Sequence, residues 1–332
     1  MNIAVVEGYG VKIGFSRGTI VVRSREGRKI LPVAELDRIV VTSSGVSITS
    51  RAVRALANYG VDLVFLDARG APVTSLTPIW ITATVETRRA QYKAFTDPYR
   101  AASIARSFAE AKIVNQGLYI KYLSKSLGAA ELGEDAERIL SHVDKLTLDF
   151  TDFEKAQSHI ISVEASAARL YWSAIASLLP RDLKFPGRDH DGADQVNRAL
   201  NYLYGILYTE CFKALTRFGF DPYAGFLHSD RSGNPSLVFD FAEMFRVSAV
   251  DSMLIRLVRE GLRVGVDERG FIDGRARARL VREFYKWIER RVRSVDGEVK
   301  SVRGHINSYS LKLSRALRSG ALYRGFVERW WG

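Results

Sequence analysis

Two segments of the chain carry side chains that could do chemistry together. His228 follows an aromatic, glycine-punctuated segment and precedes the polar stretch 229–235, after which the pattern becomes helical. Asp240 and Glu243 then lie three residues apart, so both carboxylates share one face if the helix has already begun. The same spacing is typical of a capping box, with Asp240 as N-cap and Glu243 at N3. The spacing supports both interpretations equally, and they can hold together.

Glu164 is the third candidate, in the segment IISVEASAARLYW. A carboxylate in such an apolar helix is costly to bury unless it is paired or bound to a cation. The small residues 165–168 let another segment approach closely. The alternative is that Glu164 lies on a solvated stripe of the helix, and the sequence supports the two equally.

One imidazole and two carboxylates form a hard, oxygen-rich ligand set, which suits Mg²⁺ or Mn²⁺ better than structural zinc. A divalent ion in such a site neutralises an attacked phosphate and activates the nucleophile. The residues therefore predict a metal-dependent nuclease or transesterase. A second cluster, His190 with Asp189, Asp191 and Asp194, could also bind a metal, but we favour a polar loop that ends with Asp194 capping a helix.

The charge of the chain points to a polyanionic partner. The formal net charge is +12, with 36 Arg against 13 Lys. Residues 251–332 hold 19 Lys and Arg against 10 Asp and Glu. Arginine is the better bidentate phosphate ligand, so this composition is consistent with nucleic-acid binding. The alternative is a solvated basic surface, and charge alone supports the two equally. The arginines of this region that could bind part of such a polyanion are Arg275, Arg277, Arg279, Arg282, Arg290, Arg291 and Arg293.

Cysteine count and hydropathy exclude several classes of protein. The single cysteine, Cys211, excludes an internal disulfide framework and a zinc site built from several cysteines. No apolar run approaches the length of a membrane span, and the N-terminus lacks the pattern of a secretion signal. We therefore expect a soluble, cytoplasmic protein without a membrane partner.

The elements that must position these residues change along the chain. Short Val- and Ile-rich strands are predicted up to about residue 80, with one helix over 49–59, capped by Thr49 and ended by Gly60. Helical periodicity follows over 101–127, 152–178, 194–217, 247–261, 274–295 and 304–320. The predicted class is α+β: a β-rich domain over 1–81, a linker over 82–98, and a larger all-α domain over 99–332.

With these residues in place, the chain resembles the CRISPR-associated adaptation integrase family, the nuclease-like subunit that inserts new spacers into CRISPR arrays. The matching stretches are LPVAELDRIVVTSSGVSITSRAVRALANYGVDLVFLDARG, ARSFAEAKIVNQGLYI around Lys112, Asn115 and Gln116, VEASAARLYW with Tyr171 and Trp172, DQVNRALNYLYGILY, and GFDPYAGFLH with SLVFDFAEMFR. They span nearly the whole chain in the order that the family shows.

The resemblance implies roles for individual residues. Glu164, His228 and Glu243 match the metal ligands of the family, and Asp240 matches an acidic residue that supports the metal or the DNA. It implies catalysis by these four residues with Mg²⁺ or Mn²⁺. The implied reaction is attack of a 3′-hydroxyl on a phosphodiester at the repeat boundary, with cleavage of branched DNA as its reverse.

The resemblance also implies partners: double-stranded and branched DNA, a homodimer formed through the β-domains, and a small ferredoxin-like CRISPR adaptation subunit that bridges two dimers. The implied role is antiviral defence. Two other functions compete with it. One is a non-catalytic DNA-binding scaffold of the same complex, and the other is a metallohydrolase of small phosphate esters, against which the broad basic charge argues.

Overall fold

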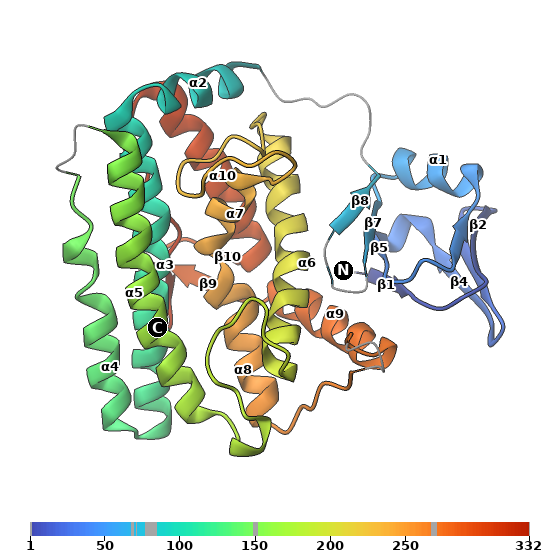
Figure 1. Ribbon diagram of the computed structural model, residues 1–332. Coiled ribbons are helices and arrows are strands. Elements are labelled where there is room, and N and C mark those ends of the chain that lie inside the picture. The colour runs from blue at the N-terminus through green and yellow to red at the C-terminus, as the bar shows by residue number, and fades with distance from the viewer. Residues whose placement is uncertain are drawn as a thin grey trace. The chain divides into compact units, whose positions relative to one another are not determined.

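The computed structural model describes residues 2–67, 70, 72–76, 85–148, 152–266 and 271–331. Contacts within the chain divide it into two compact units, whose elements are labelled in Figure 1. The first unit combines Met1–Ile81, Ala193–Ile206 and Arg263–Lys286, and the second combines Thr82–Gly192, Leu207–Leu262 and Trp287–Gly332. Strands dominate the N-terminal part and helices the rest, so the predicted α+β class is confirmed.

The first unit draws in two segments that the sequence assigned to the helical domain. The guanidinium of Arg38 binds the carboxylate of Asp62 at 2.6 Å and donates a hydrogen bond to the hydroxyl of Tyr285 at 2.8 Å. Arg277 forms an ion pair with Glu7 at 2.7 Å. These pairs join residues that are distant in the chain, so they could not be predicted from local periodicity.

Two four-stranded sheets form the β-rich part of this unit. One has the order β1 (Asn2–Val6), β5 (Leu36–Val41), β7 (Asp62–Leu66) and β8 (Pro72–Ser75), parallel except for the β7–β8 pair. The other has the order β4 (Gly27–Pro32), β3 (Thr19–Ser24), β2 (Val11–Ser16) and β6 (Val46–Ile48). A single apolar cluster, including Ile13, Ile20, Ile39 and Leu56, joins their buried side chains. The sequence missed β6 and β8, which are only three and four residues long.

Helix α1 (Ser50–Asn58) follows the local signals that predicted it. The Thr49 hydroxyl accepts a hydrogen bond from the backbone N–H of Ala52 at 3.2 Å. Gly60 then adopts a φ of +67°, a conformation that favours glycine and ends the helix. Both predictions are confirmed.

The second unit is mainly helical. Its helices are α2 (Val85–Phe95), α3 (Pro98–Leu127), α4 (Ala130–Leu140), α5 (Phe153–Leu178), α7 (Ser236–Glu243), α8 (Ser252–Arg259) and α10 (Val302–Ser319), with a π-helical turn at Val247–Asp251. Strands β9 (Arg291–Ser294), β10 (Val299–Ser301) and β11 (Glu328–Arg329) form a small sheet with β9 in the centre. Helix α6 (Gln195–Arg217) and helix α9 (Gly274–Ile288) each contain residues of both units. Figure 1 shows α3, α4 and α5 packed side by side.

The segment predicted as a linker is largely a helix of the second unit. Its residues 82–84 lie outside the described residues, but α2 begins at Val85. Thr87 shares a hydrogen bond with Ser314, and Gln91 donates to the backbone carbonyls of Asp221 and Ala224. The polar composition of this segment led to the linker prediction. The segment is polar although it is helical, because two of the three buried residues of α2, Thr87 and Gln91, are themselves polar.

Two further expectations differ from the structure. The helix predicted over 274–295 ends at Ile288, and Arg291–Ser294 is a strand instead. The sequence Arg-Val-Arg-Ser of this strand alternates exposed and buried residues, which is the period of a strand. Helix α4 was not predicted. Gly117 of α3 permits its close approach, since a Cβ there would lie 2.5 Å from Leu140. None of the described helices is both long and apolar enough to cross a membrane.

Candidate active site

The middle of α3 carries a lysine on its buried face. Lys112 lies among the buried residues Ala109, Ala111 and Ile113, and its side chain is 10% exposed. A buried ammonium needs a compensating charge. Two carboxylates supply it: Glu164 of α5 forms an ion pair with Lys112 through Oε1, and Glu243 of α7 lies 2.6 Å from the ammonium through Oε2.

Glu164 and Glu243 therefore face a single point although they come from different helices. Their side chains are 15% and 3% exposed, so the solvated-stripe interpretation of Glu164 is wrong. Glu164 Oε1 and Glu243 Oε2 are both buried without a well-directed hydrogen bond from the described residues. Lys112 offsets part of their combined negative charge.

The second oxygen of Glu243 is fixed separately. Arg246, one helical turn later, places Nη2 at 2.7 Å from Glu243 Oε1. The same guanidinium donates to the hydroxyl of Tyr208 at 2.8 Å and lies over the ring of that tyrosine. Burial would raise the pKa of Glu243, but Arg246 and Lys112 outweigh it and hold that pKa well below its usual range. Glu243 is thus an anchored carboxylate.

His228 approaches the same site through Asp240. Its Nδ1 lies 2.7 Å from Asp240 Oδ1, and because a carboxylate only accepts, Nδ1 carries the proton. Nε2, on the far edge of the ring, remains available, and the His228 side chain is 42% exposed. Burial would lower the pKa of His228, but Asp240 and then Glu243 raise it above its ordinary value. His228 therefore lies within electrostatic reach of Glu243.

Asp240 holds the loop that carries His228. It is fully buried, and it accepts backbone hydrogen bonds from Phe226 at 2.6 Å, Leu227 at 2.8 Å and His228 at 2.9 Å. Gly225 permits this closeness, since a Cβ there would lie 2.9 Å from Asp240 Oδ2. These hydrogen bonds make Asp240 a positioning residue for His228.

The capping-box interpretation is wrong. Helix α7 begins at Ser236, so Asp240 lies within the helix and not at its N-cap. Both carboxylates instead project from one helix into the interior, Asp240 toward the His228 loop and Glu243 toward Lys112. The predicted loop over 229–235 is confirmed.

The donor set suits a hard divalent cation. Glu164 and Glu243 offer carboxylate oxygens that already share a cationic group, and His228, whose pKa is raised by Glu243, offers one ring nitrogen. Among the described residues, however, no three His, Cys, Asp or Glu side chains are gathered as closely as a metal cluster requires. The Lys112 ammonium takes the position between the two glutamates. These residues fit a metal provided that this ammonium moves.

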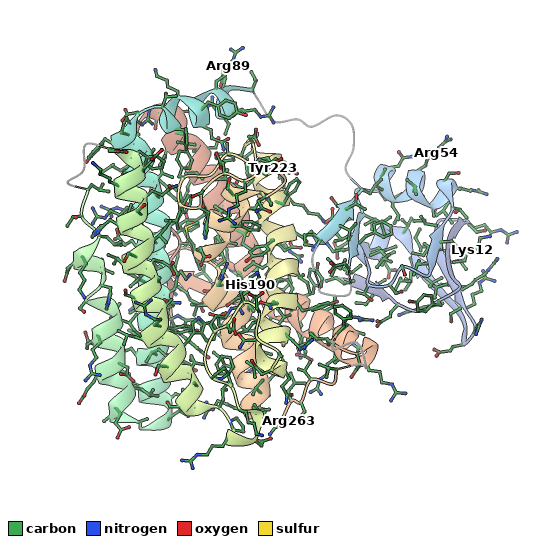
Figure 2. All side chains as sticks on the ribbon, in the orientation of Figure 1. Lys12, Arg54, Arg89, His190, Tyr223 and Arg263 are labelled. Carbon is green, nitrogen blue, oxygen red and sulfur yellow. The ribbon has the colours of Figure 1, made fainter. Side chains whose placement is uncertain are left out.

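The other candidates of the sequence lie elsewhere. His190 is on the loop before α6. Figure 2 shows it apart from Tyr223, which belongs to the segment that leads to His228. Asp194 caps α6 as predicted, accepting from the backbone of Val196 and Asn197 at 3.0 Å. Tyr171 is buried in the core, and it donates to Asp251 at 3.1 Å.

Sequence reasoning named Lys112 only within a resembling stretch and missed Arg246. A signal for Lys112 was present, because it is a single charge in the helical run from Ala111 to Gln116. The i, i+3 spacing from Glu243 is a local signal for Arg246 that was not used, whereas the contact of Arg246 with Tyr208 joins residues distant in the chain.

A groove in the second unit combines arginines with aromatic rings. It has a volume of about 700 Å³ and lies between α3, α8 and strands β9 and β11. Arg290 stacks on Trp287 at 4.6 Å and on Trp330 at 5.5 Å. We call it the arginine groove, and its guanidinium groups are those of Arg256, Arg259, Arg290, Arg291, Arg293 and Arg329.

Charges in the arginine groove are unbalanced. Arg256 pairs with Glu260 at 2.9 Å, and Arg290 pairs with Glu328 at 2.6 Å. The other four arginines have no carboxylate partner among the described residues. The groove thus carries an excess of positive charge over aromatic side chains.

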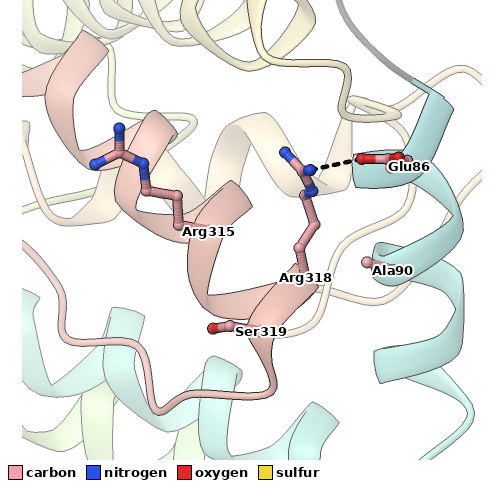
Figure 3. Close-up of a pocket in the computed structure, with 5 residues that line it drawn as sticks. All are labelled: Glu86, Ala90, Arg315, Arg318 and Ser319. Carbon is pink, nitrogen blue, oxygen red and sulfur yellow. Dashed lines mark hydrogen bonds and ion pairs between the residues drawn. The ribbon is translucent and has the colours of Figure 1, made fainter.

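A smaller basic hollow lies between α2 and α10. Figure 3 shows Arg318 in an ion pair with Glu86, while the Arg315 side chain extends away from that pair. Ala90 and Ser319 complete the lining that the described residues provide, and no aromatic ring is among them. Because one of its two arginines is neutralised, this hollow offers less to a polyanion than the arginine groove does.

Solved structures share the whole fold. A casposase bound to integration product superposes with a TM-score of 0.85 at 24% identity, covering 100% of this chain and 95% of that one. A CAS1 protein from Thermotoga maritima gives 0.78 at 20% identity, covering 98% and 99%. The fold is therefore that of the casposase and Cas1 class.

Sequence comparison assigns the family within that class. The family described as CRISPR associated protein Cas1 matches residues 4–286. The chain is 35% identical to a CRISPR-associated endonuclease Cas1 of Saccharolobus solfataricus, covering 97% of this chain and 96% of the relative. It is 37% identical to one of Hyperthermus butylicus, covering 98% of each. The chain belongs to the Cas1 family, as its sequence motifs predicted.

Proposed function

We propose that this protein is a metal-dependent DNA endonuclease and integrase that inserts new spacer DNA into CRISPR arrays. The observation that carries the proposal is that Glu164 and Glu243 meet at the buried Lys112 ammonium, with His228 near enough for the charge of Glu243 to raise its pKa. Relatives named CRISPR-associated endonucleases, with the whole chain in common, support the nuclease activity.

Each residue of the site has a defined task in this function. Glu164 and Glu243 would hold Mg²⁺ or Mn²⁺ together with Nε2 of His228. Such an ion supplies charge neutralisation at the attacked phosphate and activation of the attacking hydroxyl. Arg246 keeps one oxygen of Glu243 fixed, so that the other points into the site. Asp240 fixes the proton of His228 on Nδ1, which leaves Nε2 unprotonated for a ligand.

DNA is the proposed substrate, and the arginine groove is part of its binding surface. Unpaired guanidinium groups attract phosphates, and aromatic side chains beside them contact sugars and bases. A casposase with integration product and a Cas1–DNA complex are among the structures that share this fold. Of the arginines that the sequence proposed, Arg290, Arg291 and Arg293 line the groove, and Arg290 is paired with Glu328. Arg277 is instead paired with Glu7.

The proposed assembly is a homodimer formed through the β-domains, with a small ferredoxin-like subunit bridging two dimers. Cas1–Cas2 complexes among the similar structures support an assembly with such a partner. Strand β4 is an edge of its sheet and exposes Ile30 at 52%. An apolar residue on an open edge favours pairing with another chain.

A strand-transfer assay tests the proposal. Glu164→Gln, His228→Ala and Glu243→Gln should each lower Mn²⁺-dependent cleavage of branched DNA by at least about 100-fold, since each removes a proposed ligand. Glu137→Gln is the matched control, because Glu137 forms an exposed ion pair with Lys121. Full activity in any two of the three variants would refute the assignment. DNA binding without any metal-dependent strand transfer in the wild type would identify a scaffold instead.

A further inference from the structure

Lys112 stands at the position that both glutamates face. Its ammonium contacts Glu164 Oε1 and Glu243 Oε2, the two buried oxygens that lack a well-directed hydrogen bond from the described residues. Without a cation between them, two buried carboxylates repel each other and lose hydration. The ammonium therefore provides the charge compensation that a bound cation would provide.

We propose that Lys112 is a built-in competitor of the metal: its ammonium closes the metal-free site, and a divalent cation must displace it to bind. This inference rests on the proposed function. Mg²⁺ and Mn²⁺ bind carboxylate oxygens at about 2.1 Å. The ammonium contacts both Glu164 Oε1 and Glu243 Oε2, so it occupies the position that an ion bound to these two oxygens would take, and the two positive charges would repel. Lys112 thus sets the metal concentration at which the site fills.

The two cations around Glu243 are suited to different tasks. Arg246 binds Oε1 and is held by the hydroxyl and the ring of Tyr208, so it is fixed. Lys112 binds Oε2 with a compact ammonium on a flexible four-carbon stem, which can move without disturbing the helix. Glu243 therefore keeps one oxygen anchored while the other exchanges its cation.

Variants of the full-length protein test the exchange. Lys112→Met keeps the apolar stem and removes the charge. In EDTA it should lower the Tm by about 5 °C or more, because two buried carboxylates lose their partner. In Mn²⁺ titrations followed by calorimetry it should bind about tenfold more tightly, since no ammonium competes. Lys121→Met is the matched control on the same helix, because Lys121 pairs with Glu137 at 37% exposure.

Outcomes separate this inference from the proposed function. If the wild type binds Mn²⁺ and Glu164→Gln weakens it, but Lys112→Met binds no more tightly, the competition is refuted and the metal site stands. A Tm in EDTA that does not fall also refutes it. If the wild type binds no Mn²⁺ at Glu164 and Glu243, both proposals fail.

A second measurement needs no variant at the site. Reductive methylation of the wild type, read by mass spectrometry, reports how accessible each lysine is. In EDTA, Lys112 should be protected relative to Lys121, in keeping with their 10% and 37% exposure. In saturating Mn²⁺ its labelling should increase several-fold. Equal protection in both conditions would overturn the displacement of Lys112 even if Lys112→Met fails to fold.

Discussion

The candidate active site and the arginine groove use charge in opposite ways. Around Lys112, each buried charge meets an opposite one, so Glu164, Glu243, Lys112 and Arg246 sum to zero. In the groove, four of six arginines have no carboxylate partner within the described part of the chain. Buried charges must be matched because desolvation is costly, whereas exposed charges can stay unmatched in water. The first arrangement fixes geometry, and the second attracts a polyanion.

Asp240 gives the largest expected effect on the buried side of the comparison. Asp240→Ala leaves three backbone N–H groups and the His228 ring without an acceptor. We expect a loss of about 3–5 kcal/mol in the free energy of unfolding, measured by urea denaturation. Asp240→Asn keeps an acceptor for part of this set and should lose less stability. Equal stability of Asp240→Ala and the wild type would mean that the His228 loop is held by other interactions.

On the exposed side of the comparison, the arginine groove should control the affinity for DNA without changing the free energy of unfolding. Replacing Arg259, Arg293 and Arg329 by Gln should weaken DNA binding about 10- to 100-fold at moderate salt. The slope of log K against log salt should fall by about three, since each substitution leaves one phosphate without its guanidinium. Fluorescence anisotropy at several salt concentrations measures both.

A matched triple variant controls for net charge alone. Arg89, Arg138 and Arg318 lie outside the groove, and Figure 2 shows Arg89 projecting outward from α2. Their replacement by Gln should reduce the slope by less. If the two triple variants bind DNA equally well, the arginine groove contributes to binding only through the net charge of the protein and is not a specific binding surface.

The smallest effect is expected from the ion pair of Lys312 with Asp296, which is more exposed to solvent than the ion pairs of Lys112. Burial would raise the pKa of Asp296, but hydrogen bonds from Lys312 and Ser294 lower it to about 2. Because the folded value lies below the ordinary value of 3.8, the stabilisation is present above that value and is lost as the pH falls toward 2. The Asp296 side chain is 45% exposed, so screening limits the effect to less than about 1 kcal/mol.

Denaturation curves between pH 5 and about 2.5 check the sign. The wild type should lose stability relative to Asp296→Asn over this range. Lys312→Met should remove much of that difference, because Lys312 donates to Asp296 at 2.6 Å. A wild type that gains stability relative to Asp296→Asn on acidification would contradict the lowered pKa.

The elements that local physics governs could be predicted from the sequence. Thr49 and Asp194 were recognised as caps because a cap acts on backbone groups two or three residues away. Strands such as Leu36–Val41 followed from their apolar runs. Glu164, His228 and Glu243 were found by residue type and resemblance, since few carboxylates lie in apolar helices.

Tertiary structure alone decided what those residues do to one another. The sequence could not tell whether Asp240 caps α7 or supports His228, because that depends on where the backbone of Phe226 and Leu227 folds back. It also could not pair Lys112 with Glu243, or Arg38 with Tyr285, since helices and strands distant in the chain bring them together. Residue types set which charges exist, and packing sets which of them share a desolvated site.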